Sequence, residues 1–199
     1  MHQRSPELKQ FLDSLHHAIV TKSSTGSRAH FVTEKIMNAL SEPKMPASPI
    51  NHMLPLCTLI DDVVNNLSAE PTVKQHAKAL RALAPSLKWW HRSDASEIGE
   101  PFASGHANTT VIGPGGLEER DDVWIGISLL APDIDYPVHH HPPEEVYLVL
   151  SPGEWQQNNG DWHEPGVGGI VHNPPDILHA MRSGKKPLLA TWCLLAHTA

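Results

Sequence analysis

The chain has 199 residues, with 15 lysines and arginines against 22 aspartates and glutamates, which gives a formal net charge of -7. Such an acidic chain is a poor electrostatic partner for nucleic acid or an anionic membrane, so we expect neither as a partner. Its 40% hydrophobic and 19% charged residues exclude a disordered tail. No apolar stretch approaches the roughly 18 residues of a membrane span, and no signal-peptide core is present, which predicts a soluble, cytoplasmic protein.

The first half of the chain carries apolar residues at helical spacing. A capping serine followed by a proline, Ser5-Pro6, starts the first predicted helix, and Ser27 opens the second. The third predicted helix lies within residues 56–67, and the fourth begins near Pro71. Residues 42–55 between the second and third helices are rich in proline, which predicts a loop.

The second half changes to short β-type runs separated by glycine and proline. The predicted strands cover residues 109–112, 123–131, 146–150, 169–172 and 188–195. Strand alternation places Val123, Ile125, Ile127 and Leu129 on one face. Many short strands separated by turns are typical of a β-sandwich or barrel. We therefore expect a helical segment over residues 1–95 that packs on or caps a β-barrel domain over residues 96–199.

A run of histidines within residues 139–147 carries the clearest chemical signal. Residues two apart on a strand share a face, so the odd-numbered polar members of this run should point to one place. They are His139, His141, Glu145 and Tyr147. Imidazole, carboxylate and phenolate groups together suit Zn, Fe, Mn, Ni or Co. The alternative interpretation is a run of surface histidines without a ligand.

A second histidine segment lies downstream, where a glycine turn, a strand and a proline turn lead to His179. His179 begins the next predicted strand and is positioned to complete the ligand set from the opposite side. The alternative is an ordinary turn histidine. His172 is an outside candidate, and His163 lacks a partner pattern. The remaining scattered histidines are expected at the surface or in loops: His16, His17, His30, His52, His76, His91, His106 and His197.

These two segments resemble the two conserved motifs of the cupin family. The matching positions are His139, His141 and Glu145 in the first motif and Gly168, Pro174 and His179 in the second. The departures are Asp133, Pro152, Asp176 and Ser183. They weaken the turn signature more than the ligand signature. The resemblance covers roughly residues 100–199 and implies a double-stranded β-helix, a jelly-roll barrel, with one transition metal ion per subunit.

A narrower resemblance is to the cupin-type dimethylsulfoniopropionate (DMSP) lyases of marine bacteria, in which a helical segment precedes a compact cupin. It implies a lyase that cleaves DMSP by β-elimination to dimethyl sulfide and acrylate. The implied metal-site residues are His141, Glu145, Tyr147 and His179. His139 is either a further ligand or a neighbour of the ligands that faces the substrate. Tyr136 or Tyr147, the two tyrosines of the chain, is the implied general base.

The chemistry of such a reaction makes demands on the remaining residues. A free tyrosine has a pKa of about 10, so a tyrosine base needs a nearby cation. A sulfonium offers no hydrogen-bond donor, so aromatic faces are its natural binding surface. Trp192, Trp155 and Trp124 are the candidates, with core packing as the alternative for each, and Phe102 and Met181 are weaker lining candidates.

Other functions also fit the predicted barrel. They are another metal-dependent cupin enzyme, such as a dioxygenase or isomerase, and a non-catalytic cupin that binds a small ligand. The sequence leaves open whether the chain is a monomer or a homodimer.

Overall fold

The structure is a computed structural model, which describes residues 2–47 and 51–196. Its main helices are α1 (Pro6–Lys22), α2 (Arg28–Ala39), α3 (Leu59–Asn65) and α4 (Pro71–Leu83). The hydroxyl oxygens of Ser5 and Ser27 cap α1 and α2 by accepting backbone N–H bonds of 3.2 Å, as the sequence predicts. Within the described ranges, no helix combines the length and the apolar character needed to cross a bilayer.

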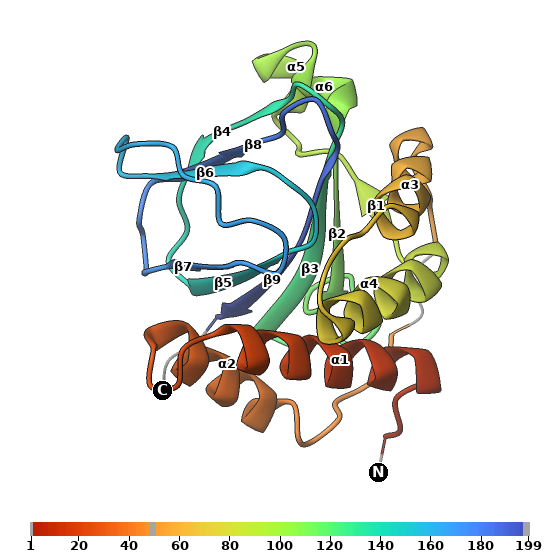
Figure 1. Cartoon of the computed structure of the whole chain (residues 1–199). Helices are drawn as coiled ribbons and strands as arrows, with labels where there is room; N and C mark the ends of the chain where they lie inside the picture. The colour runs from red at the N-terminus through yellow and green to blue at the C-terminus, as the bar shows by residue number, and fades with distance from the viewer. Residues whose placement is uncertain (1, 48–50, 197–199) are drawn as a thin grey trace.

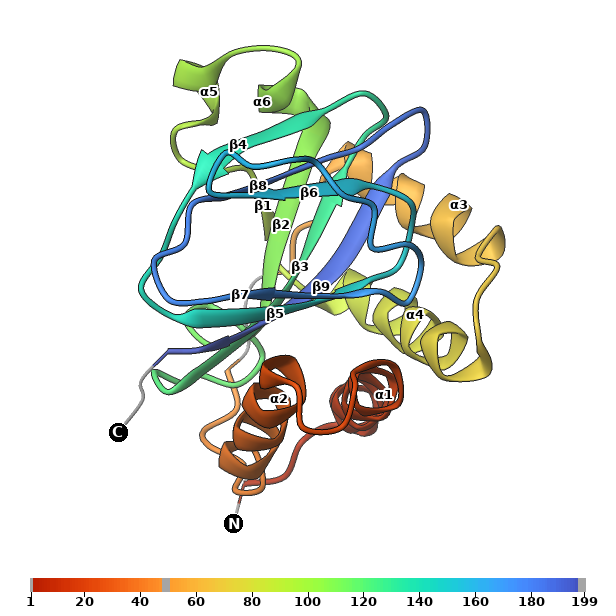
Figure 2. The ribbon, with the colours of Figure 1, turned by 60° about the vertical axis from the view of Figure 1, so that its left-hand side comes forward.

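The strands form two antiparallel sheets that face each other (Figures 1 and 2). The larger sheet has the order β1-β2-β3-β9-β5-β7, and the smaller has the order β4-β8-β6. The larger sheet contains β1 (Trp89–Trp90), β2 (His106–Ile112), β3 (Val123–Leu130), β9 (Leu188–Leu195), β5 (Glu144–Val149) and β7 (Ile170–Asn173). The smaller contains β4 (Asp135–His139), β8 (His179–Arg182) and β6 (Glu154–Gln157). Two short helices, α5 (Ala95–Ile98) and α6 (Phe102–Gly105), lie beside β4 (Figure 1).

The two faces of the larger sheet contact different parts of the molecule. Val123, Ile125, Ile127 and Leu129 belong to one buried cluster with the apolar faces of the helices, so the prediction that they share a face is confirmed. Helix α2 contacts β9, β5 and β7, and α1 packs along α4. The opposite face of the sheet lines the inside of the barrel, where Tyr136, Tyr147 and Trp155 form a second cluster.

Two scattered histidines are buried, which corrects the prediction that all of them lie at the surface or in loops. His76 is fully buried on α4, where its ring nitrogens bond to the hydroxyls of Ser14 and Thr191 at 3.2 and 2.9 Å. It stands at helical spacing between the buried residues Val73 and Leu80, so it occupies the apolar face. His106 is buried at the start of β2. His197 lies outside the described residues.

Three strands were not predicted, because each is too short for a clear pattern of apolar alternation. They are β1, β4 and β6, which measure two, five and four residues. β5 also begins earlier than predicted, at Glu144, because Glu144 and Glu145 are both buried and paired with β9. The division of the chain at residue 95 stays a prediction, although β1 lies before it and pairs with β2.

Candidate metal centre

Three histidines and one glutamate meet where the two sheets approach each other. His139 ends β4 and His179 begins β8, and the two are register partners. His141 lies in the loop that leads to β5, on which Glu145 sits. The candidate ligand nitrogens of the three histidines lie within 4.8 Å of one another. Glu145 Oε2 lies 3.4 Å from the Nε2 atoms of both His141 and His179.

The backbone fixes how each imidazole presents its nitrogens. In all three histidines, Nδ1 lies 2.9 Å from a carbonyl oxygen two residues away, that of Pro137, Pro143 or Ile177. A carbonyl oxygen only accepts hydrogen bonds, so Nδ1 carries a proton, and in the neutral imidazole Nε2 keeps a free lone pair. His179 Nε2 is buried and has no hydrogen-bond partner among the described residues. Three such nitrogens beside a carboxylate fit a transition metal ion.

The carboxylate of Glu145 is buried and oriented by an amide relay. Asn173 Nδ2 donates to Glu145 Oε2 at 2.8 Å, and Gln157 Nε2 donates to Asn173 Oδ1 at 2.6 Å. Burial opposes ionisation, but His141, His179 and Asn173 outweigh it and hold the pKa of Glu145 below its ordinary value. Sequence reasoning missed Asn173 and Gln157, since a lone amide carries no spacing pattern.

The protonation of two of the three imidazoles also suits a ligand role. Burial lowers the pKa of His139 to about 4, with the neighbouring His179 as the second cause. Burial also lowers the pKa of His179. For His141, burial acts in the same direction, but Glu145 outweighs it and raises the pKa. His139 and His179 are therefore neutral near pH 7, with lone pairs available for a cation.

The two tyrosines approach the histidines from different sheets. The ring of Tyr136 on β4 lies 5.0 Å from that of His139, and its hydroxyl accepts a 3.4 Å hydrogen bond from Asn108. Tyr147 follows Glu145 by two residues on β5, so both side chains face the barrel interior. Burial raises the pKa of both phenols, and the carboxylate of Glu145 raises that of Tyr147 further. A phenolate here needs a compensating cation.

The predicted aromatic residues divide between the site and its surroundings. Trp155 lies inside the barrel, with its ring centroid 6.2 Å from that of Tyr147. Trp192 is the register partner of Tyr147 and packs against Gly126, where any side chain would collide with its ring. Trp124 packs over Gly113 in the turn after β2. Phe102 and Met181 belong to the interior cluster.

The other histidines of the region lie outside this constellation. His172 Nε2 contacts Glu144 Oε1 at 2.6 Å, and Glu144 also receives both arms of Arg28 from α2, at 2.6 and 2.7 Å. His172 is therefore engaged in a hydrogen-bond network that links α2, β5 and β7. His163 is exposed in the loop after β6.

The predicted site residues do meet, but strand alternation is not the physical cause. His139, Glu145 and Tyr147 were expected on one face of one strand, but the chain leaves β4 after His139 and enters the other sheet at Glu144. Pro142 and Pro143 occupy the connection. The residues meet because the barrel closes, and closure also brings in His179.

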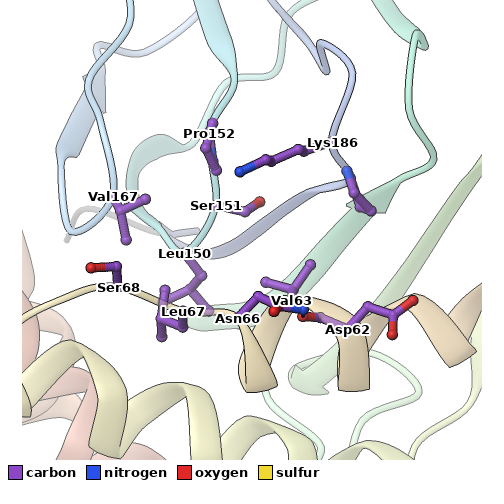
Figure 3. Close-up of a pocket in the computed structure, with 11 residues that line it drawn as sticks. Asp62, Val63, Asn66, Leu67, Ser68, Leu150, Ser151, Pro152, Val167 and Lys186 are labelled. Atoms are coloured by element: carbon purple, nitrogen blue, oxygen red, sulfur yellow. The ribbon is translucent and has the colours of Figure 1, made fainter.

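A cavity of about 520 Å³ lies elsewhere, between α3 and the loops that follow β5 and precede β9 (Figure 3). Its lining includes Val63, Leu150, Ser151 and Lys186. Ser151 lies six residues beyond Glu145, past the other end of β5, which corresponds to about 20 Å of extended chain. The three histidines of the candidate centre and Glu145 do not line it, so this cavity is separate from the histidine cluster.

Comparison with known proteins places the chain in a family. The model of the dimethylsulfoniopropionate lyase family matches residues 28–190, from α2 into β9. The chain belongs to the DMSP lyase family. Over 113 residues it is 27% identical to dimethylsulfoniopropionate lyase DddQ of Ruegeria pomeroyi, a match that covers 56% of each chain. The match thus spans little more than half the length of this relative.

Solved structures agree with this assignment at the level of the fold. The crystal structure of DMSP lyase DddQ from Ruegeria pomeroyi superposes with a TM-score of 0.79 and 23% identity, over 98% of this chain and 95% of that chain. A structure described with the DMSP lyases RdDddP and RnDddQII gives a TM-score of 0.68 and 22% identity, over 95% and 92% of the two chains. The predicted cupin barrel with a preceding helical segment is confirmed.

Proposed function

We propose that this chain is a metal-dependent lyase that cleaves DMSP by β-elimination to dimethyl sulfide and acrylate. One observation carries the proposal, in a chain of the DMSP lyase family: the imidazole nitrogens of three histidines meet a buried carboxylate between two tyrosines. The family model matches residues 28–190, and that range includes every member of this constellation.

The residues that would hold the metal are His139, His141, His179 and Glu145, with Tyr147 beside them. When bound, a transition metal ion supplies Lewis acidity, which neutralises a substrate carboxylate and favours a phenolate nearby. The reaction requires both the neutralised carboxylate and the phenolate. The α-proton of DMSP lies next to an ionised carboxylate and is weakly acidic, and burial holds the phenols of Tyr136 and Tyr147 protonated.

In the elimination, a tyrosine of the chain removes one proton from the substrate, and dimethyl sulfide leaves. A tyrosine oxygen, of Tyr136 or Tyr147, takes the α-proton of DMSP. The electrons of the broken Cα–H bond form the Cα–Cβ double bond of acrylate. The Cβ–S bond breaks, and its electron pair leaves with sulfur as neutral dimethyl sulfide. Because the sulfonium is already a good leaving group, the residues have only to position the substrate and accept one proton.

The aromatic residues of the barrel interior would hold the sulfonium. Trp192, Trp155 and Tyr147 face the same interior. Their ring faces attract a cation that cannot donate hydrogen bonds. The interior is also largely closed to water, since Trp155 and Tyr147 are only 1% and 3% exposed. Exclusion of water strengthens the attraction between charges in the site.

The proposal is tested with the purified full chain, its metal content measured, incubated with DMSP in sealed vials. We expect dimethyl sulfide in the headspace and an equal amount of acrylate in solution. The rate should be the same with and without oxygen, because the elimination consumes none. A metal-loaded protein that releases no dimethyl sulfide would overturn the proposal. Oxygen uptake with small acids would instead indicate a dioxygenase.

A further inference from the structure

Arg92 is a partly buried cation at the edge of the candidate site, outside the residues discussed so far. It lies in the loop between β1 and α5, and its side chain is 22% exposed. Its Nε and Nη2 atoms donate to the two carboxylate oxygens of Asp94 at 2.9 and 2.6 Å. The guanidinium also makes a side-chain hydrogen bond with Tyr136, which affects the pKa of Arg92 less than the pair with Asp94 does. Asp94 occupies two of the five N–H groups, so the guanidinium keeps donors that Asp94 does not use.

The backbone of Arg92 is fastened to the start of β2. Its N–H donates to His106 Nε2 at 2.8 Å, while His106 Nδ1 lies 2.6 Å from the carbonyl oxygen of Phe102. The rings of His106 and Phe102 stack at 3.9 Å with an angle of 3° between their planes. His91 Nδ1 adds a 2.6 Å contact to the His106 carbonyl oxygen. These bonds hold the guanidinium in a fixed place, as recognition of a carboxylate requires.

The guanidinium is close to the proposed reaction centre. Its central carbon lies 5.3 Å from the centre of the Tyr136 ring, which lies 5.0 Å from the ring of His139. Phe102 meets Tyr136 edge-on at 5.3 Å, so Arg92, Phe102 and His139 surround one phenol. The positive charge of Arg92 also acts on both neighbours, since it opposes the rise in the pKa of Tyr136 and contributes to the lowered pKa of His139.

We propose that Arg92 recognises the carboxylate of the substrate through the guanidinium N–H groups that Asp94 does not use, and thereby sets which end of a zwitterion enters the metal side of the barrel. This inference rests on the proposed function, because DMSP carries a carboxylate at one end and a sulfonium at the other. A guanidinium attracts the carboxylate and repels the sulfonium, so the sulfonium is directed toward Trp192 and Trp155. Arg92 is thus a specificity determinant that selects β-substituted propionates over their uncharged amides.

Two measurements on the metal-loaded protein test the role of Arg92. Isothermal titration calorimetry with acrylate and propionate reports carboxylate binding without turnover, and the KM for DMSP reports it during turnover. We expect Arg92→Gln to weaken acrylate binding and raise KM by about tenfold or more, since a charge-assisted hydrogen bond is lost. Arg92→Lys should fall between this variant and the wild type. Arg81→Gln, on an exposed face of α4, is the matched control and should bind like the wild type.

Acrylate binding of wild-type strength in a folded, metal-loaded Arg92→Gln protein would overturn the inference. If Arg92→Gln does not fold, Arg92→Lys decides: weakened acrylate binding supports the inference and unchanged binding overturns it. Failure of the proposed function is recognised separately. The test then shows a wild-type protein that binds acrylate through Arg92 and yet releases no dimethyl sulfide. That result would support carboxylate recognition by Arg92 and overturn the proposed lyase function.

Discussion

Asn173 on β7 and Glu145 on β5 are register partners, and the side-chain amide of Asn173 donates to Glu145 Oε2 across 2.8 Å. The asparagine is fully buried, and its own carbonyl oxygen accepts from Gln157. One oxygen of the carboxylate is therefore held in place from behind while it faces two imidazoles. Such partners of a ligand determine its orientation and its charge.

Replacement of Asn173 by leucine should weaken metal binding while the four candidate ligands stay intact. Residues behind metal ligands typically contribute about 10–100-fold to affinity, and we expect a loss of that order. Competition with a chromophoric chelator measures it. Gln156→Ala is the control, because the only side-chain hydrogen bond of Gln156 among the described residues goes to the carbonyl oxygen of Gly160 in the turn after β6. Equal affinities of the wild type and Asn173→Leu would contradict the proposed relay.

His179→Ala should abolish stoichiometric metal binding. The side chain is 3% exposed, and its Nε2 faces Glu145 with no other partner among the described residues. Elemental analysis of purified protein gives the metal content per chain. His163→Ala removes an exposed histidine from the loop after β6 and should leave the content unchanged. Retention of one ion per chain in His179→Ala would show that His179 is not a ligand.

Single substitutions that each remove one phenolic oxygen distinguish the roles of the two tyrosines. Loss of a general base typically costs about 10²–10⁴-fold in rate. We therefore expect Tyr136→Phe or Tyr147→Phe to lose dimethyl sulfide production by that order while its metal content stays at one ion per chain. Headspace chromatography and elemental analysis of the same samples provide both values. High activity in both variants would exclude a tyrosine base.

His76 should make stability depend on pH. Burial lowers its pKa to about 3, whereas the unfolded chain has the ordinary value near 6.5. Below pH 6.5 the unfolded state binds a proton that the folded state does not, so the stabilisation is complete above pH 6.5 and falls as the pH drops. From pH 6.5 to 5 the loss is about 2 kcal/mol, at 1.36 kcal/mol per pKa unit.

Urea unfolding of the wild type and of His76→Gln at pH 7.5 and pH 5 tests this expectation. Glutamine keeps hydrogen-bonding capacity toward Ser14 and Thr191 but does not titrate. The advantage of the wild type should shrink by about 2 kcal/mol between the two pH values. A constant difference would mean that His76 is not the titrating group.

Sequence patterns predicted the helices and the long strands well, because both depend on local information. The capping serines Ser5 and Ser27 fixed two helix starts, and the alternation from Val123 to Leu129 identified the sheet face under the helices. The candidate ligands were named from motif spacing. The sequence did not predict roles for Asn173 and Arg92, because their importance depends on strand register and barrel closure, which bring distant positions together. The burial of His76 was not predicted, because a scattered histidine was expected to be exposed to solvent.

The candidate ligands come from both walls of the barrel, with His139 and His179 on the smaller sheet and Glu145 on the larger. An ion held by all of them would fasten one wall to the other, in the manner of a cross-link that can be withdrawn. Its binding energy would then add to the resistance of the barrel mouth against opening. Chelation should accordingly lower the melting temperature and speed hydrogen exchange in β4 and β5 first, while the sheet under the helices stays protected.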